Sequence, residues 1–424
     1  MFNNITTFIR RLIKEGFGSA YLFQFTTIFY SFFLIFIFNY FNLTFEYGQY
    51  VLLIASLDFL TSFIGFNSGE SIIYFLAKKT YTVNSILKIG RITDLILGSL
   101  IVIFSLIIFM FISSGYIEIA YSLAAFFSLK TLFILLRNSV NGFWQYNNLF
   151  TKFYGIMISE LIFKIIIILI ISFGFLKFNL KSLILTEVLT TLAFTIIIYV
   201  LFLFDYNRIN IRPANKSKKL YFRSFFSYSS KLFMTATLKS GNKKIDYLIL
   251  GLFVTPLEVG IYDKLKKIFL PVNAFIQPFR QIYFPKYIKK INSKSYAEAN
   301  SIVVKLSFYL SLIVCVFVLF VSFLKQPIFD LLKIENSYEI NFLFYCLPFT
   351  SLFLSIFWWV TNFSSSVNPN FSLYANLIST FCIITSSSIL LYMFGFVGIG
   401  LSLLVNSIIL AVYWIIKYKK HEFN

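Results

Sequence analysis

Glu46-Tyr47-Gly48-Gln49-Tyr50 and Glu258-Val259-Gly260-Ile261-Tyr262 share one pattern, E-x-G-x-Y, and lie half of the 424-residue chain apart. Each copy lies in a short polar gap between two long apolar runs. Five residues are a short match, but the surroundings of the two copies match as well. We therefore predict that the chain consists of two related halves.

The composition is typical of a membrane protein. Hydrophobic residues make up 58% of the chain, charged residues make up 13%, and the mean hydropathy is +0.81. A soluble domain is about half apolar and about a quarter charged. The net charge of +20 comes mostly from short basic clusters between apolar runs. This distribution favours orientation in a bilayer and argues against a nucleic-acid partner.

Residues for metal binding or nucleophilic catalysis are scarce. Cys315, Cys346 and Cys382 lie inside apolar runs without CxxC spacing, and His421 is the only histidine. The sequence therefore excludes a histidine-based metal site or catalytic triad. It also lacks a phosphate-binding loop, HExxH and GxSxG, so we predict no catalytic residues, no cofactor and a protein that is not an enzyme.

The apolar runs predict an all-α integral membrane protein with twelve transmembrane helices, six in each half. A span needs ~20 mostly apolar residues, and twelve runs meet that length. We predict the following domains: residues 1–16, an amphipathic helix on the membrane surface; 17–204, a first lobe with spans 1–6; 205–223, a basic cytoplasmic connector; 224–416, a second lobe with spans 7–12; and 417–424, a cytoplasmic tail.

Successive short loops alternate between many and few basic residues, so one side of the predicted membrane is rich in Lys and Arg and the other is poor. With the N-terminus inside, the rich side is cytoplasmic throughout the twelve crossings. Both termini are then cytoplasmic, and the two halves form a parallel repeat about an axis along the membrane normal.

The seventh predicted span carries polar residues along one helical face: Thr235, Lys239, Asn242, Lys243 and Asp246. One Lys or Asp at the centre of a span costs about 2.5–3.5 kcal/mol when it faces lipid. We therefore expect this stripe to face protein or a water-filled cavity. Because Asp246 can neutralise only one of the two lysines, a basic cavity suited to phosphate or pyrophosphate results.

Three other predicted spans carry polar groups. The eighth has Lys266, Asn273, Gln277 and Arg280 with Lys267 beside them, the fourth has Lys130 and Arg137, and the second has Asp58 and Glu70. Each lysine or arginine could instead form an interhelical ion pair or extend to the membrane surface from a span end. Glu160 and Lys164 are four residues apart, and Arg91 and Asp94 are three apart, so each pair could neutralise itself.

Short stretches resemble the Wzx-type O-antigen and capsule flippases, which belong with lipid II flippases and MATE exporters in one superfamily. Lys244–Gly251 followed by Glu258–Lys264 resembles their seventh and eighth helices, and Phe45–Tyr50 resembles the start of their second helix. Gly142–Tyr146, with Lys152 and Tyr154, is similar to their turn between helices four and five. The first span lacks the arginines of the lipid II flippases.

The resemblance implies two six-helix lobes around a central cavity that opens alternately to either face. It also implies a substrate, an undecaprenyl-pyrophosphate-linked oligosaccharide moved from the inner to the outer leaflet of the bacterial cytoplasmic membrane for O-antigen or capsule synthesis. A polysaccharide polymerase and glycosyltransferases would be functional partners. The predicted substrate-binding residues are Lys239, Lys243, Lys266, Lys130, Arg137, Arg280, Asn242, Asn273 and Gln277.

Several questions stay open from the sequence. Asp246, Asp58 and Glu70 are the candidate carboxylates for coupling to a proton or sodium gradient. The alternatives to a flippase are a MATE-like exporter of cationic small molecules, which would need an excess of cavity carboxylates, a membrane glycosyltransferase or polymerase, and a scaffold. For E-x-G-x-Y itself we predict a turn at the outer face, with Gly at a bend, Glu at a helix N-terminus and Tyr at the membrane interface.

Overall fold

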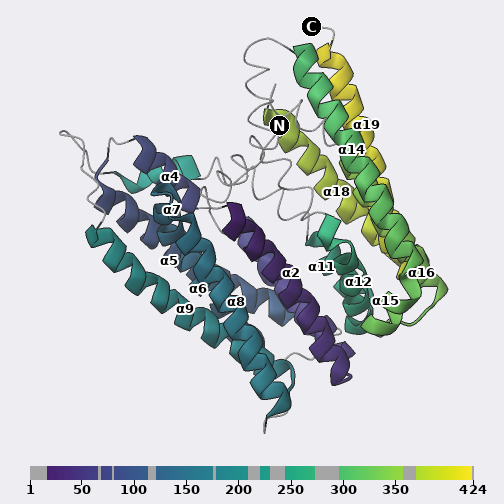
Figure 1. The fold of residues 1–424 in the computed structure, drawn as a ribbon, viewed down its shortest axis with the longest axis horizontal. Helices are drawn as coiled ribbons and strands as arrows, with labels where there is room; N and C mark the ends of the chain where they lie inside the picture. Colours follow the sequence, from purple (N-terminus) through teal and green to yellow (C-terminus); the bar gives the residue numbers. More distant parts are fainter. Residues whose placement is uncertain are drawn as a thin grey trace, which may run out of the picture. The chain divides into compact units, whose positions relative to one another are not determined.

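The computed structural model describes residues 17–64, 68–78, 81–112, 121–174, 178–208, 220–229, 244–272, 296–356 and 369–422. The regular elements of these ranges are helices (Figure 1), which confirms the prediction of an all-α fold. They are α2 (Phe17–Tyr40), α3 (Thr44–Ile64), α4 (Ser68–Lys78), α5 (Val83–Ile112), α6 (Tyr121–Leu136), α7 (Asn138–Tyr146), α8 (Phe150–Phe173), α9 (Leu180–Arg208), α11 (Ile245–Phe253), α12 (Pro256–Ile268), α14 (Tyr296–Phe323), α15 (Lys325–Leu332), α16 (Tyr338–Ile356), α18 (Pro369–Phe394) and α19 (Val397–Glu422).

Several of these helices are long and apolar enough to cross a bilayer. Six qualify in the described part of the chain, in α2, α5, α8, α9, α18 and α19, and a seventh results if the bent pair Ser307–Phe323 and Lys325–Leu332 is one span. Large apolar side chains are exposed on them, such as Phe204 at 70% and Phe323 at 86%. A lipid environment covers such surfaces. The chain is thus a multi-pass membrane protein, and the number of twelve spans stays a prediction.

Some predicted segments are only partly described. The amphipathic helix of residues 1–16 lies outside the described residues, as do residues 209–219 of the connector. Helix α9 continues to Arg208, so the described start of the predicted connector is helical, and α19 continues through most of the predicted tail. The lobe boundaries stay a prediction.

The chain divides into two compact units. The first comprises Met1–Ile37 and Ser56–Thr237, and the second comprises Phe38–Ala55 and Leu238–Asn424. The division passes through α3, so the first E-x-G-x-Y belongs to the same unit as the second copy. This grouping follows from side-chain contacts described below.

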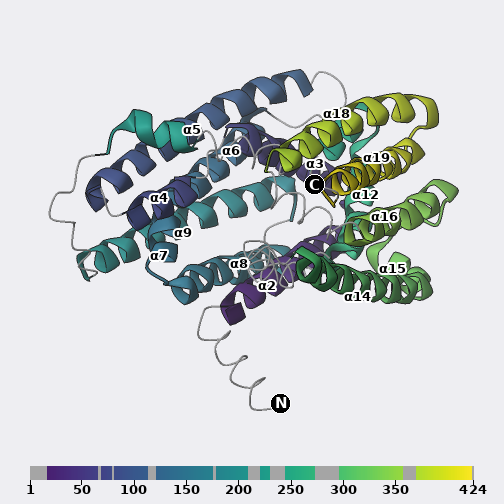
Figure 2. The same ribbon diagram turned by 90° about the horizontal axis from the view of Figure 1, so that it is seen from above.

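The first unit packs α5 against α6 and α6 against α9, as Figure 2 shows, with α4 and α7 in contact beside them. Its aromatic core includes Phe143 and Trp144, both fully buried. The Trp144 ring nitrogen donates to Asp205 Oδ2 at 2.9 Å, and Lys152 Nζ lies 2.6 Å from the same oxygen. The stretch Gly142–Tyr146, which resembles a turn between two helices in sequence, therefore lies in the short helix α7. Asp205 of α9 contacts both α7 and α8 through Trp144 and Lys152.

The second unit packs α18 along α19, with α16 against α19 and α11 against α18 (Figure 1). Lys264 of α12 is 1% exposed and connects α12 to the last turn of α2. Its Nζ donates to Asn39 Oδ1 at 2.7 Å and to the Leu332 carbonyl at 3.0 Å. Lys333 donates to the Asn39 carbonyl at 2.8 Å from a left-handed backbone conformation. These bonds explain why residues from Phe38 onward belong to the second unit.

Candidate functional site

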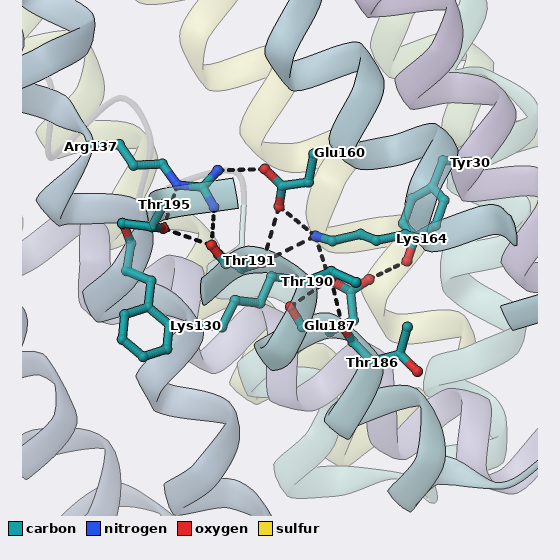
Figure 3. Close-up of polar contacts among 11 residues, drawn as sticks. Tyr30, Lys130, Arg137, Glu160, Lys164, Thr186, Glu187, Thr190, Thr191 and Thr195 are labelled. Atoms are coloured by element: carbon teal, nitrogen blue, oxygen red, sulfur yellow. Dashed lines mark hydrogen bonds and ion pairs between the residues drawn. The ribbon is translucent and has the colours of Figure 1, made fainter. Parts of the chain in front are cut away.

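A buried ionic network joins α2, α6, α8 and α9 in the first unit, and Figure 3 shows its members. Lys164 Nζ lies 3.0 Å from Glu160 Oε1 and 3.0 Å from Glu187 Oε2. Lys130 Nζ lies 2.8 Å from Glu187 Oε2, and Tyr30 donates its hydroxyl to Glu187. We call this set, together with Arg137, the Glu160–Glu187 network. The predicted pairing of Glu160 with Lys164 is confirmed, and the structure extends it to a second glutamate.

Arg137 is an internal member of this network. It is 4% exposed, and its guanidinium donates to Glu160, to the Thr191 carbonyl and, at 2.7 Å, to Thr195 Oγ1. These partners come from α8 and α9, so the guanidinium connects helices. The structure therefore favours the interhelical ion pair for Arg137 over the predicted contact with substrate.

The Glu160–Glu187 network carries more cations than carboxylates. Lys130, Arg137 and Lys164 face Glu160 and Glu187, which leaves one formal positive charge. The Lys130 side chain is 18% exposed, against 5% for Arg137 and 6% for Lys164. An anion that approaches this network would meet Lys130 first.

A second cluster lies in the second unit, on α3, α11 and α12. Lys266 Nζ lies 2.6 Å from Asp246 Oδ2, and Lys267 Nζ lies 2.9 Å from Asp263 Oδ2. We call these four residues, with the tyrosines Tyr47, Tyr247 and Tyr262, the Asp246–Asp263 cluster. Its formal charges balance, because two lysines face two aspartates.

The three tyrosines bind the two carboxylates crosswise. Tyr262 donates to Asp246 Oδ2 at 2.5 Å, while Tyr247 donates to Asp263 Oδ1 at 2.9 Å and Tyr47 donates to Asp263 Oδ2. The rings also carry the ammonium groups, since Lys266 Nζ lies 4.4 Å from the Tyr247 ring centre and Lys267 Nζ lies 5.4 Å from that of Tyr47. All three rings are buried, at 5% exposure or less. Cation–π contact and hydrogen bonding thus act together at these lysines.

The two copies of E-x-G-x-Y build this cluster. A Cβ on Gly48 would lie 1.6 Å from the Pro256 carbonyl oxygen, and one on Gly260 would lie 3.3 Å from the Gly48 Cα. The two glycines therefore let α3 and α12 touch at their backbones. This contact brings Tyr47 from the first copy to Asp263, and Tyr262 of the second copy binds Asp246.

The predicted role of the motif is partly wrong. Glu46 and Glu258 do lie in first helical turns, and Thr255 and Glu258 form a reciprocal capping box, so the helix N-terminus is confirmed. The glycines, however, lie inside helices and not at bends. Tyr50 and Tyr262 are 2% and 0% exposed, so both are buried within the protein and are not exposed as anchors at a membrane surface.

The predicted binding residues fall into three groups. Lys266 belongs to the Asp246–Asp263 cluster, and Lys130 and Arg137 belong to the Glu160–Glu187 network. The remaining six, Lys239, Asn242, Lys243, Asn273, Gln277 and Arg280, lie outside the described residues. Their part in binding stays a prediction.

The three candidate coupling carboxylates differ in burial. Asp246 is 2% exposed, whereas Asp58 in α3 and Glu70 in the first turn of α4 are exposed. Sequence reasoning gave no role to Glu187 or Asp263, which are 1% and 7% exposed and pair with lysines. The signal for Glu187 was a carboxylate alone in a long apolar run, which must find a cation from another helix.

Arg91 and Asp94 do not form the pair that their spacing suggested. Asp94 accepts hydrogen bonds from the Ser68 hydroxyl and, at 3.2 Å, from the Ser139 backbone N–H. The Arg91 guanidinium lies 4.9 Å from the centre of the Phe202 ring. Asp94 thus acts as an acceptor between helices, and its contacts point to a structural role.

Solved structures with this fold are transporters. The chain is similar to a multidrug resistance MATE family transporter of the MOP superfamily in an inward-facing conformation, with 14% identity, a TM-score of 0.65, and coverage of 93% of this chain and 94% of that chain. It is also similar to the Vibrio cholerae MATE transporter VcmN in a bent form, with 12% identity, a TM-score of 0.60 and 97% coverage of both chains. A MOP superfamily transporter from Pyrococcus furiosus matches with 14% identity and a TM-score of 0.58 over 96% of this chain and 92% of that one. At these identities the likeness establishes the fold.

The sequence comparison identifies the family. None of the curated proteins compared with the chain matches it. A family described as polysaccharide biosynthesis protein matches residues 43–332, which is more than half of the chain and includes both copies of E-x-G-x-Y. The protein therefore belongs to the polysaccharide biosynthesis protein family, on the fold of the MOP superfamily transporters.

Proposed function

We propose that the protein is a flippase for an undecaprenyl-pyrophosphate-linked oligosaccharide, which it moves from the inner to the outer leaflet of the bacterial cytoplasmic membrane. The transport step serves the synthesis of a surface polysaccharide such as O-antigen or capsule. A polymerase and glycosyltransferases act on the same lipid-linked glycan before and after it. Family membership and transporter fold support this proposal.

One observation carries the choice of an anionic substrate. In three ion pairs the lysine is the more exposed partner and the carboxylate the more buried one. The side-chain exposures are 18% and 1% for Lys130 and Glu187, 28% and 3% for Lys266 and Asp246, and 19% and 9% for Lys267 and Asp263. The lysine side chains are thus the more accessible partners in these pairs, and a ligand with negatively charged phosphate oxygens suits their positive charge.

A MATE-like exporter of cationic small molecules is the alternative. It would need carboxylates presented to the ligand, and the carboxylates of both ionic clusters are instead buried behind cations. One similar structure is described as having a binding pocket of reversed polarity that suggests a different function. The fold alone therefore does not fix the charge of the substrate, and the arrangement of lysines supports an anion.

The test is export in a strain that lacks the gene. Wild-type protein should restore surface polysaccharide, while replacing Lys239 and Lys243 with Ala should lower it by at least about tenfold, since each lost charged contact is worth about 1.5–3 kcal/mol. Lys305→Ala, an exposed lysine of α14, is the matched control. Normal export by the double variant at normal protein level contradicts the proposed site. Lipid-linked glycan that still reaches the outer leaflet in the deletion strain contradicts the function.

A further inference from the structure

The carboxylates of the Asp246–Asp263 cluster do not depend on their lysines for hydrogen bonds. Asp246 also accepts from the Tyr262 hydroxyl at 2.5 Å and from the Tyr247 backbone N–H at 3.0 Å. Asp263 accepts from the hydroxyls of Tyr47 and Tyr247. Each buried carboxylate thus keeps two donors if its lysine leaves, and the usual cost of an unpaired buried charge is reduced.

Lys266 and Lys267 lie where they can separate from their aspartates. Lys266 and Lys267 are neighbours in the last turn of α12, where the helix dipole favours positive charge. Both amines rest on tyrosine rings and keep an exposed side, with 28% and 19% side-chain exposure. Lysines at two successive positions offer two positive charges to a ligand with several anionic oxygens on linked phosphorus atoms.

We infer that Lys266 and Lys267 are exchangeable cations that pair with Asp246 and Asp263 in the empty protein and with the phosphate oxygens of a pyrophosphate-bearing lipid in the loaded one. This inference rests on the proposed function and adds Lys267 to the binding residues. The two aspartates are positioning residues that compete with the ligand for the lysines. The tyrosines hold the aspartates in place while the lysines exchange partners.

Removing the charge of an aspartate that competes with the ligand should strengthen ligand binding. The direction of this change in affinity distinguishes partner exchange from a purely structural role of the aspartate. Asp246→Asn and Asp263→Asn keep the shape but remove the negative charge. The carboxamide oxygen accepts one of the two hydrogen bonds, and its NH2 group donates to a tyrosine hydroxyl, which then accepts. Each should bind the ligand about tenfold more tightly than wild type, whereas Lys266→Ala and Lys267→Ala should bind about tenfold more weakly. If the aspartates only stabilised the fold, all four variants would bind more weakly.

The experiment measures binding to the purified full-length protein in lipid nanodiscs with three probes. Farnesyl pyrophosphate tests the lipid-linked ligand, inorganic pyrophosphate tests the headgroup alone, and farnesol tests the tail alone. Asp330→Asn, an exposed acid on α15, controls for a general change of charge, and Lys305→Ala controls for the loss of a lysine. Farnesyl pyrophosphate should show the opposed shifts and farnesol none. Equal shifts with inorganic pyrophosphate show that the headgroup suffices.

A second readout needs no variant. An amine-reactive label should modify Lys266 and Lys267 in the empty protein, and farnesyl pyrophosphate should protect both while leaving Lys305 reactive. Weaker binding by the asparagine variants, or no protection of the two lysines although the probe binds, overturns the exchange and leaves the proposed function standing. Failure of wild-type protein to bind farnesyl pyrophosphate overturns both.

Discussion

The two ionic clusters of this protein compensate their buried carboxylates in different ways. In the Glu160–Glu187 network Lys164 bridges both carboxylates, and Arg137 and Lys164 are only 5% and 6% exposed. In the Asp246–Asp263 cluster each carboxylate has one lysine, and tyrosine hydroxyls and one backbone N–H supply further contacts. Shared cations connect helices, while separate and exposed cations remain available to a ligand.

The physical basis of this difference is the cost of removing one partner. A buried charge that loses its only counter-ion costs about 3–5 kcal/mol, much more than the pair contributes when intact. A shared cation makes its own loss costly, because one substitution removes contacts with two carboxylates at once. Neutral donors lower the cost, because the carboxylate stays hydrogen-bonded. The first network is therefore suited to holding helices together and the second to exchanging partners.

The largest expected effect is at Lys164. Lys164→Met should lower the free energy of unfolding by about 3–5 kcal/mol, because two buried contacts between charged groups, each worth about 1.5–3 kcal/mol, are lost at once, although Arg137 and Lys130 still neutralise Glu160 and Glu187. Lys266→Met should lower it by less, about 1.5–3 kcal/mol, because one such contact is lost and Asp246 keeps two donors. Denaturant unfolding in mixed micelles measures both.

Ile166→Met on the same helix is the control for Lys164→Met, since Ile166 is 46% exposed and its exchange for Met uncovers no charge. Equal losses at Lys164 and Lys266 would break the contrast between the two clusters.

The next effect tests how the Asp246–Asp263 cluster is assembled. Gly48→Ala places a Cβ against the Pro256 carbonyl oxygen, a backbone atom that cannot rotate away. We expect a loss of about 1–3 kcal/mol from overpacking and a loss of farnesyl pyrophosphate binding, because Tyr47 is displaced from Asp263.

Gly155→Ala on α8 is the matched control, because a Cβ there meets no atom within 4 Å. It should be neutral or slightly stabilising, as Ala is favoured over Gly in helices by up to ~1 kcal/mol. A Gly48→Ala variant that unfolds and binds like wild type would show that the close contact of α3 and α12 is dispensable.

The sequence predicted the class of fold well, because apolar runs near the bilayer length leave few alternatives. It also singled out Lys130, Arg137, Lys266 and Asp246 as charges that must find partners. It could not say which partners, since Glu187 and Lys130 come from different helices and Tyr47 is far from Asp263 in the chain. Pairing between helices depends on packing, which hydrophobic periodicity does not specify.

The misplaced role of E-x-G-x-Y has a related cause. A glycine between two apolar runs is compatible with a bend or with a close helix contact, and one sequence does not distinguish them. Here Gly48 and Gly260 face each other, so the glycine of each copy is required by the close approach of the other copy. The repeat was a correct indication of an important element, but Tyr47 of the first copy and Tyr262 of the second belong to the ionic cluster, and Tyr50 is buried.

The smallest expected effect compares one tyrosine from each cluster. Tyr262→Phe removes a donor from Asp246, which then keeps Lys266 and one backbone N–H. Tyr30→Phe removes a donor from Glu187, which keeps both Lys130 and Lys164. Hydrogen bonds to charged groups contribute about 1.5–3 kcal/mol, so Tyr262→Phe should cost about 1.5 kcal/mol. Tyr30→Phe should cost less, about 0.5–1 kcal/mol, because two ammonium groups still neutralise the glutamate. Both substitutions keep the ring, so denaturant unfolding of the two variants isolates the hydroxyl. The reverse order would mean that the Asp246–Asp263 cluster relies on its lysines for stability, and the lysines would then not be free to exchange partners.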